Sequence, residues 1–300
     1  MEKIYYKERF TGKKILENPP GKGFINFIYN SSLGKLTLEA MVKRKVVSYL
    51  YGKYMDSKRS RKMIPDFIKK NNINIEEAKL APDKYKTFNQ FFYRNLKDKA
   101  RKLGRGLISP ADGKILVFNE IDDNRNFFIK GEEFTLSQFI GDDGLVKKYY
   151  KGSMAIIRLA PADYHRFHFP ATGVVSKSKK IDGNYYSVSP LAMKKSLQFF
   201  LKNKREYSIL ESEKFGEILY SEIGATMVGS IIQTYKPDTK VEKGDEKGYF
   251  AFGGSSLLLL FEKDKVKFSE DLLKNTNEGF ETKINMGETI GNSTIDNGIV

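Results

Sequence analysis

Near Gly106 the hydrophobic pattern of this 300-residue chain changes period, and the change limits the architectures open to it. Before that point apolar residues recur at helical spacing. After it, short apolar runs are bounded by Gly, Pro, Asp and Asn, which is typical of β-strands, as at 114–118, 154–159 and 256–261. Because neither a Pro/Gly/Ser-rich linker nor a repeat interrupts the chain, we expect an α+β protein. A helical layer of residues 1–105 would pack on a β-rich, largely antiparallel core of residues 106–300.

Four segments have helical periodicity: 36–54, 61–71, 87–102 and 190–202. In the first, Leu38, Met41 and Val42 fall on one face, while Lys43 and Arg44 fall mostly elsewhere. This predicts a basic amphipathic helix. Such a helix packs on its own protein or lies in a membrane interface, and the pattern leaves both open.

The composition excludes several kinds of functional site. The chain has no Cys, which excludes disulfides, thiolate metal sites and a cysteine nucleophile. No window approaches 18 consecutive apolar residues, and the first ten residues are charged, so we expect neither a membrane span nor an export signal.

The net charge of +15 is concentrated at the N-terminal end, where residues 1–105 hold 26 Lys or Arg against 10 Asp or Glu, hence +16. A basic region of this kind suits an anionic partner, either nucleic acid or the acidic surface of a bilayer. A solvated basic surface without a partner explains the charge equally well.

The chain contains only two histidines, His165 and His168, which lie between Pro161 and Pro170. The flanking prolines favour a short helical turn, on which residues three apart share a face. Each histidine alone is commonly a hydrogen-bonded structural residue. Zinc needs a third ligand, and neither Cys nor a carboxylate at helical spacing supplies one, so we predict no metal site.

Two further segments carry reactive groups. Asp112 lies in a Pro-Ala-Asp-Gly turn before a predicted strand, and Ser255 follows Gly253 and Gly254 and precedes four leucines. Carboxylate, imidazole and hydroxyl are the set that activates a serine oxygen, as in a serine hydrolase. The Gly-x-Ser-x-Gly elbow is absent, however, and the serine precedes a leucine run instead of a helix. The pattern favours a serine that attacks its own chain.

These segments together resemble the phosphatidylserine decarboxylases. Pro110 to Gly113 is similar to the aspartate motif of that family, Tyr164 to Pro170 to its histidine motif, and Phe252 to Ser256 to its processing site. Further similar stretches are Phe88 to Arg94, Lys130-Gly131, Leu136 to Gly141, Asn203 to Glu206 and Gly224 to Ile231. The resemblance is dense from Tyr85 to Glu262. It departs from the family at Gly-Gly-Ser-Ser, where Leu-Gly-Ser-Thr is common, and at Asn-Lys-Arg, where the family has Asn-Glu-Arg.

The resemblance implies a mechanism. His168, held by Asp112, would take the proton of Ser255, whose oxygen would attack the carbonyl of Gly254. The chain would separate into residues 1–254 (beta chain) and 255–300 (alpha chain), with Ser255 converted to a covalent pyruvoyl group. That group would bind the amine of phosphatidylserine as a Schiff base and accept electrons as carbon dioxide leaves. His165 would supply the proton that completes phosphatidylethanolamine.

The implied substrate predicts a peripheral protein on the cytoplasmic side of the cell membrane, docked on anionic lipid through its basic N-terminal region. A pyruvoyl-dependent decarboxylase of a soluble amino acid is the nearest alternative, followed by a serine hydrolase. A nucleic-acid-binding module rests on charge alone, and we expect no nucleic-acid partner. Whether the chain forms a homo-oligomer stays open.

Overall fold

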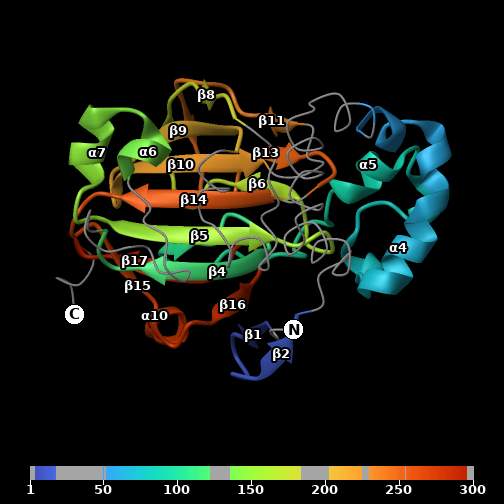
Figure 1. Cartoon of the computed structure of the whole chain (residues 1–300), viewed down its shortest axis with the longest axis horizontal. Coiled ribbons are helices and arrows are strands. Elements are labelled where there is room, and N and C mark those ends of the chain that lie inside the picture. The colour runs from blue at the N-terminus through green and yellow to red at the C-terminus, as the bar shows by residue number, and fades with distance from the viewer. Residues whose placement is uncertain are drawn as a thin grey trace, which may run out of the picture.

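The computed structural model describes residues 4–17, 50, 52–121, 136–183, 203–224, 230–253 and 255–295, and its centre is one large sheet (Figure 1). Every pairing between its described strands is antiparallel except that of β1 with β16. The α+β class and the largely antiparallel core are therefore confirmed. In spatial order the strands are β12 (Thr239–Val241), β7 (Gly173–Val175), β9 (Arg205–Ser212), β10 (Gly216–Gly224), β14 (Ser255–Phe261), β5 (Ser153–Leu159), β4 (Gly113–Phe118), β16 (Glu281–Ile284), β1 (Tyr5–Glu8) and β2 (Lys14–Leu16), with β8 (Lys179–Ile181) on β9.

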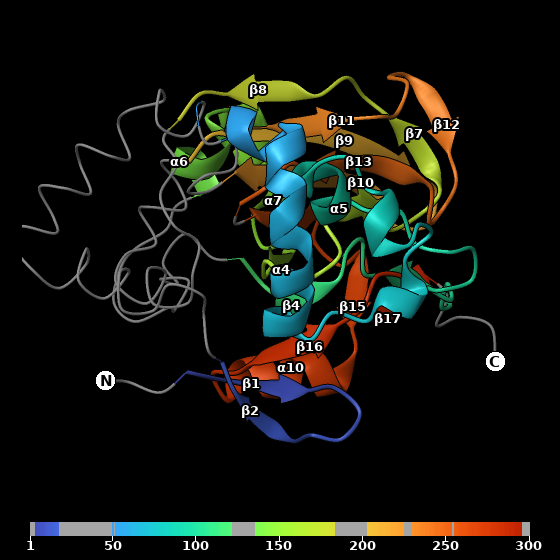
Figure 2. The ribbon, with the colours of Figure 1, turned by 90° about the vertical axis from the view of Figure 1, so that its right-hand side faces the viewer.

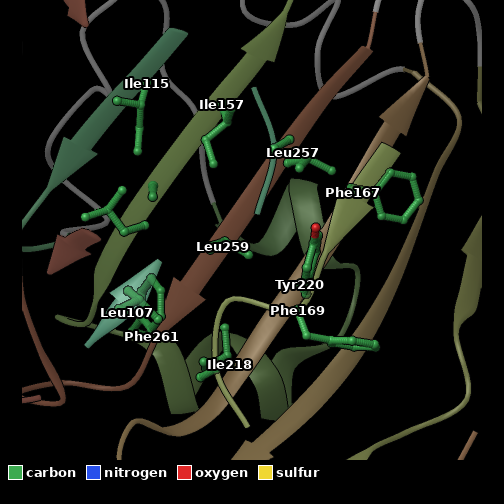
Figure 3. Close-up of a cluster of buried hydrophobic side chains, with 14 of the residues drawn as sticks. Leu107, Ile115, Ile157, Phe167, Phe169, Ile218, Tyr220, Leu257, Leu259 and Phe261 are labelled. Carbon is green, nitrogen blue, oxygen red and sulfur yellow. The ribbon is translucent and has the colours of Figure 1, made fainter. Parts of the chain in front are cut away.

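Two small sheets complete the β-structure of the described residues. One has the order β11 (Ile231–Gln233), β13 (Glu246–Phe250), β6 (Arg166–His168), and the other β15 (Val266–Phe268), β17 (Thr289–Ser293), β3 (Leu107–Ile108). Side chains of the first small sheet, among them Phe167 and Phe250, pack with Tyr220, Leu257 and Leu259 of the large sheet in the main core (Figure 3). The sheet with the histidines thus covers one face of the central strands.

Strand β14 is buried on both faces because its leucines alternate between two cores. Leu257 and Leu259 belong to the main core, whereas Leu258 and Leu260 belong to a second cluster on the opposite face. Helices α6 (Leu136–Ile140) and α7 (Asp143–Tyr149) contribute to that second cluster. Helix α10 (Glu270–Asn277) lies against β4 and β16. The uninterrupted leucine run is explained by this two-sided burial.

The N-terminal layer lies beyond one end of the large sheet (Figures 1 and 2). Its described elements are the helical residues 52–55, η1 (Lys58–Met63), α4 (Ile64–Asn71), η2 (Ile75–Glu77), η3 (Pro82–Lys84) and α5 (Phe88–Phe92). They share a separate cluster that includes Met55, Ile64 and three phenylalanines of α5. The helix expected at 61–71 is confirmed by η1 and α4, with Pro65 in the first turn and left-handed Asn72 as the C-cap.

Within residues 1–105, the described structure differs from the sequence-based expectations at two places. Residues 4–17 form strands of the large sheet, where β1 pairs with β16, instead of helix. Helix α5 ends at Phe92, far short of the expected Lys102, because the chain turns there to form a bridge between Leu96 and Ala78. The helix expected at 190–202, and the one expected at 36–54 up to residue 49, lie outside the described residues.

Candidate active site

The two histidines lie on an extended segment, which corrects the helical turn expected for them. Strand β6 pairs with β13, with Arg166 opposite Tyr249 and His168 opposite Glu246. The carbonyl of His165 accepts a hydrogen bond from the N–H of Phe250 at 2.9 Å. Because β13 satisfies this backbone as a sheet, the two rings have different surroundings instead of a shared helical face.

His168 is held as a neutral base. Its Nδ1 lies 3.0 Å from the carbonyl oxygen of Gly244, which only accepts, so Nδ1 carries the proton. Its Nε2 accepts a hydrogen bond from the hydroxyl of Tyr164 at 3.1 Å. Burial lowers the pKa of His168, chiefly through desolvation of the imidazolium. The Nε2 lone pair is therefore the basic site of this side chain.

His165 is buried completely and has one open nitrogen. Its Nδ1 donates to the carbonyl of Asp163 at 2.8 Å, whereas its buried Nε2 has no hydrogen-bond partner. The ring of Phe92 lies against the imidazole, with centroids 3.8 Å apart. Burial lowers the pKa of His165 to about 4, so the imidazole is neutral at physiological pH.

Asp112 does not make the hydrogen bond to His168 that the family resemblance implies. Arg101 donates two hydrogen bonds to its carboxylate, from Nε at 3.0 Å and from Nη2 at 2.6 Å. The N–H of Met286 donates a third at 2.7 Å. The Asp112 carboxylate is therefore satisfied by Arg101 and Met286, whereas Nδ1 of His168 is satisfied by the carbonyl of Gly244. The turn still adjoins the histidine strand, since the N–H of His168 donates to the carbonyl of Pro110 at 2.8 Å. The negative charge of Asp112 also favours the protonated form of both imidazoles.

Gly113 explains how the Asp112 turn comes so close to the central sheet. A Cβ at this position would lie 2.7 Å from the carbonyl oxygen of Arg158, closer than real Cβ contacts come. Only glycine allows this approach without a shift of the neighbouring backbone.

Ser255 is the first residue of β14 and is fully buried between Gly224 of β10 and Leu159 of β5. Alternation along the strand puts its side chain on the face of Leu257, which is the face covered by the histidine sheet. Its Oγ has no hydrogen-bond partner. A buried hydroxyl without a partner is costly to keep, and a catalytic role is one explanation for such a site.

The backbone just before Ser255 has an unusual conformation. Gly253 has φ of +143°, a value that residues with a side chain rarely adopt. Gly254, the expected site of chain cleavage, lies outside the described residues.

Side chains of helix α5 contact both His165 and the segment that precedes Ser255. Phe252 packs edge-on against Phe92, with ring centroids 5.0 Å apart, and Phe92 also covers His165. The N–H of Phe252 donates to the Oδ1 of Asn89 at 2.9 Å, and Asn89 donates to Asp56. In Figure 1, α5 faces the end of the sheet at which β14 begins. The N-terminal layer therefore forms one wall of the site.

Comparison with known proteins decides the family. The family model described as phosphatidylserine decarboxylase matches residues 88–292, which is more than half of the chain. The chain belongs to this family.

Curated phosphatidylserine decarboxylase proenzymes are similar to it over nearly their whole length. The protein of Fusobacterium nucleatum is 51% identical over 294 residues, 97% of this chain and 98% of that one. The proteins of Clostridium kluyveri and Clostridium perfringens are each 46% identical, covering 96% and 97% of this chain and 98% and 100% of their own.

A decarboxylase of this family needs a serine that becomes a covalent carbonyl group, and the site fits that requirement. Ser255 has a buried, unpartnered hydroxyl, glycines precede it, and burial lowers the pKa of both histidines, which keeps them neutral. Among the described residues, no cluster of three His, Asp or Glu is arranged to hold a metal ion. The described helices also include none long and apolar enough to cross a membrane.

Sequence reasoning missed four participants in this geometry: Asn89, Phe92, Tyr164 and the carbonyl of Gly244. The stretches that contain Asn89, Phe92 and Tyr164 are part of the family resemblance, which was the available signal. A backbone carbonyl such as that of Gly244 leaves no mark on the sequence.

Proposed function

We propose that this chain is a proenzyme that cuts itself between Gly254 and Ser255 and then converts phosphatidylserine to phosphatidylethanolamine. The proposal is supported chiefly by Ser255, a fully buried residue with an unpartnered hydroxyl on the sheet face covered by the histidine strand. Such burial in the uncut chain suits attack on the chain's own backbone better than attack on an external ester, because a solvent-borne substrate does not reach that oxygen before cleavage.

In the first reaction His168 is the base, since its Nε2 carries the lone pair. Loss of the hydroxyl proton lets the Oγ of Ser255 form a bond to the carbonyl carbon of Gly254. The bond between that carbon and the nitrogen of Ser255 breaks, and the proton moves to the nitrogen, which leaves an ester.

In the second reaction the ester is lost by elimination. Removal of the α-proton of residue 255 expels the carboxylate of Gly254, and residue 255 becomes a dehydroalanine. Its tautomer adds water and releases ammonia, so residues 255–300 begin with a pyruvoyl ketone. That ketone supplies an electrophile for the substrate amine and a sink for the electrons released with carbon dioxide.

We assign proton transfer during turnover to His165. Its Nδ1 is fixed by Asp163, and its unpartnered Nε2 is free to accept a proton. Because its pKa is about 4 before substrate binds, the imidazole is neutral when the substrate arrives. The anionic substrate raises the pKa of the nearby imidazole, which can then return the proton to carbon.

We also propose that the N-terminal layer docks the protein on anionic lipid at the cytoplasmic side of the cell membrane. Between residues 58 and 62 the four cations Lys58, Arg59, Arg61 and Lys62 are all exposed. We call these four residues the basic cluster. Leu50, at 59% exposure, adds an apolar group nearby in the sequence. Cations and exposed apolar groups together favour the interface of an anionic bilayer.

The test is carbon dioxide release from carboxyl-labelled phosphatidylserine in vesicles and, separately, from free serine and other amino acids. We expect turnover of the lipid alone. Turnover of a free amino acid without activity on the lipid would establish the soluble-substrate alternative. An intact, lipid-inactive chain labelled at Ser255 by a fluorophosphonate would establish a hydrolase.

A further inference from the structure

The loop between β5 and β6 leads from the strand neighbour of Ser255 to His165, and Asp163 holds this loop. Leu159, the last residue of β5, lies opposite Ser255. The Oδ2 of Asp163 accepts a hydrogen bond from the N–H of Ala160 at 2.7 Å, and the N–H of Asp163 donates to the carbonyl of Ala160 at 2.8 Å. The carbonyl of Asp163 accepts the proton of Nδ1 of His165. The position of His165 beside the Ser255 strand therefore depends on Asp163.

A lysine from the C-terminal part of the chain holds the carboxylate of Asp163. The Nζ of Lys283, in β16, donates to its Oδ1 at 2.6 Å. Burial alone would raise the pKa of Asp163, but the cations Lys283 and Lys114 lower it well below its usual range. The carboxylate is therefore ionised, and its buried charge is compensated.

Self-cleavage would put the two members of this ion pair on different polypeptides. Lys283 belongs to residues 255–300, the piece that would begin with the new ketone. Asp163 and His165 belong to residues 1–254. The smaller piece would thus supply both the electrophile and the lysine that holds the loop of His165.

We propose that Asp163 and Lys283 position His165 for proton transfer during decarboxylation. The inference rests on the decarboxylation proposed above, and both residues act through His165. The carbonyl of Asp163 fixes the proton on Nδ1, so Nε2 is the atom that exchanges protons. The bond between Lys283 and the carboxylate keeps that carbonyl against the imidazole.

The same pair sets the charge near His165. Burial lowers the pKa of His165, whereas the hydrogen bond to Asp163 and the charge of its carboxylate raise it. Arg94 lowers this pKa and Asp112 raises it. Loss of the Asp163 charge should therefore lower the pKa of His165 further. Loss of Lys283 should raise it, because the carboxylate then has no cation bonded to it. A contact that only stabilises the fold predicts no such opposite shifts.

The first experiment measures kcat for phosphatidylserine in mixed micelles as a function of pH, with the purified, cut enzyme. We expect Asp163→Asn and Lys283→Met each to lower kcat about 10-fold, the scale of a small displacement of a catalytic group, with KM nearly unchanged. The pKa that His165 contributes to the profile should fall in Asp163→Asn and rise in Lys283→Met. Lys283→Arg keeps the ion pair and should restore both the rate and the profile.

Lys7→Met is the matched control, because Lys7 forms an ion pair with Glu278 that would also join the two polypeptides. It should leave kcat and its pH profile unchanged.

Nuclear magnetic resonance of labelled histidine gives a second readout, since the chain has only two histidines and His165→Gln assigns their signals. In the full chain carrying Ser255→Ala, the titration of His165 should shift in opposite directions with Asp163→Asn and Lys283→Met. This measurement needs neither cleavage nor activity.

An unchanged titration of His165 in both variants would overturn the inference, and so would shifts in the same direction. Equal effects of Lys7→Met and Lys283→Met would overturn it as well. A wild-type chain without activity on phosphatidylserine would instead overturn the proposed function and leave the titration result intact, so the two failures are distinguishable.

Discussion

The ring of Phe92 lies 3.8 Å, centroid to centroid, from the imidazole of His165, and the same ring contacts Phe252 just ahead of Ser255. One side chain of the N-terminal layer thus touches both a candidate catalytic residue and the segment to be cut. The layer therefore helps to shape the site in addition to carrying positive charge.

This contact predicts that Phe92→Leu, which keeps an apolar side chain but removes the flat ring, reduces decarboxylation about 10-fold. A small displacement of His165 is enough for such a loss. Phe268→Leu is the control, since Phe268 is equally buried but lies in β15. Initial rates on phosphatidylserine vesicles, with melting temperatures for both variants, check the prediction. Equal activity losses in the two variants would contradict it.

The two histidines are expected to fail in different ways. His168→Ala removes the base and should remain one uncut chain. His165→Ala should still be cut, because Nε2 of His165 takes no part in self-cleavage, but should lose turnover by 10²-fold or more. Electrophoresis and carbon dioxide release measure the two reactions separately. Cleavage of His168→Ala at the normal rate would contradict the assignment.

The low pKa of His165 predicts loss of stability in acid. The unfolded imidazole titrates near 6.5 and the folded one at about 4, so the unfolded state binds more protons between these values. The contribution of His165 to the free energy of unfolding is fully present above about pH 6.5. It falls by about 3 kcal/mol in total as the pH drops towards 4.

Urea unfolding between pH 7 and 4 tests this most cleanly in the uncut Ser255→Ala background. Adding His165→Gln should reduce the loss of unfolding free energy between pH 7 and 4 by about 3 kcal/mol. An identical decline with and without His165 would show that its folded pKa is not depressed.

Charge reversal should weaken membrane binding. Replacing Lys58, Arg59 and Lys62 with Glu removes roughly 1 kcal/mol of attraction per cation, so binding to anionic vesicles should fall on the order of 100-fold. Lys180, Lys240 and Lys263 are exposed lysines elsewhere, and their replacement with Glu is the control. Vesicle flotation at low and high salt measures the effect. Equal binding by both triple variants would remove the basic cluster from the docking surface.

The sequence predicted the central strands well because their signals are local. The runs at 114–118, 154–159 and 256–261 are apolar, bounded by turn residues, and buried as β4, β5 and β14. Helix α4 was likewise predicted from its period. In contrast, β1 and β2 are short and partly polar, and their place in the large sheet depends on β16 at the far end of the chain.

The site was predictable in its residues and less so in its contacts. The segments of Asp112, His168 and Ser255 were identified by their chemistry and family resemblance. The partners of Asp112 were not, because Arg101 and the N–H of Met286 reach it through the tertiary fold. The histidine segment was assigned to a helical turn from its flanking prolines, because two histidines three residues apart show neither a helical nor a strand period.

The intact mass of the purified protein tests self-cleavage most directly. The account predicts two polypeptides, residues 1–254 and residues 255–300, the second beginning with a pyruvoyl group in place of serine. It also predicts a single full-length mass for Ser255→Ala. An uncut wild-type chain that decarboxylates phosphatidylserine at full rate would contradict the account.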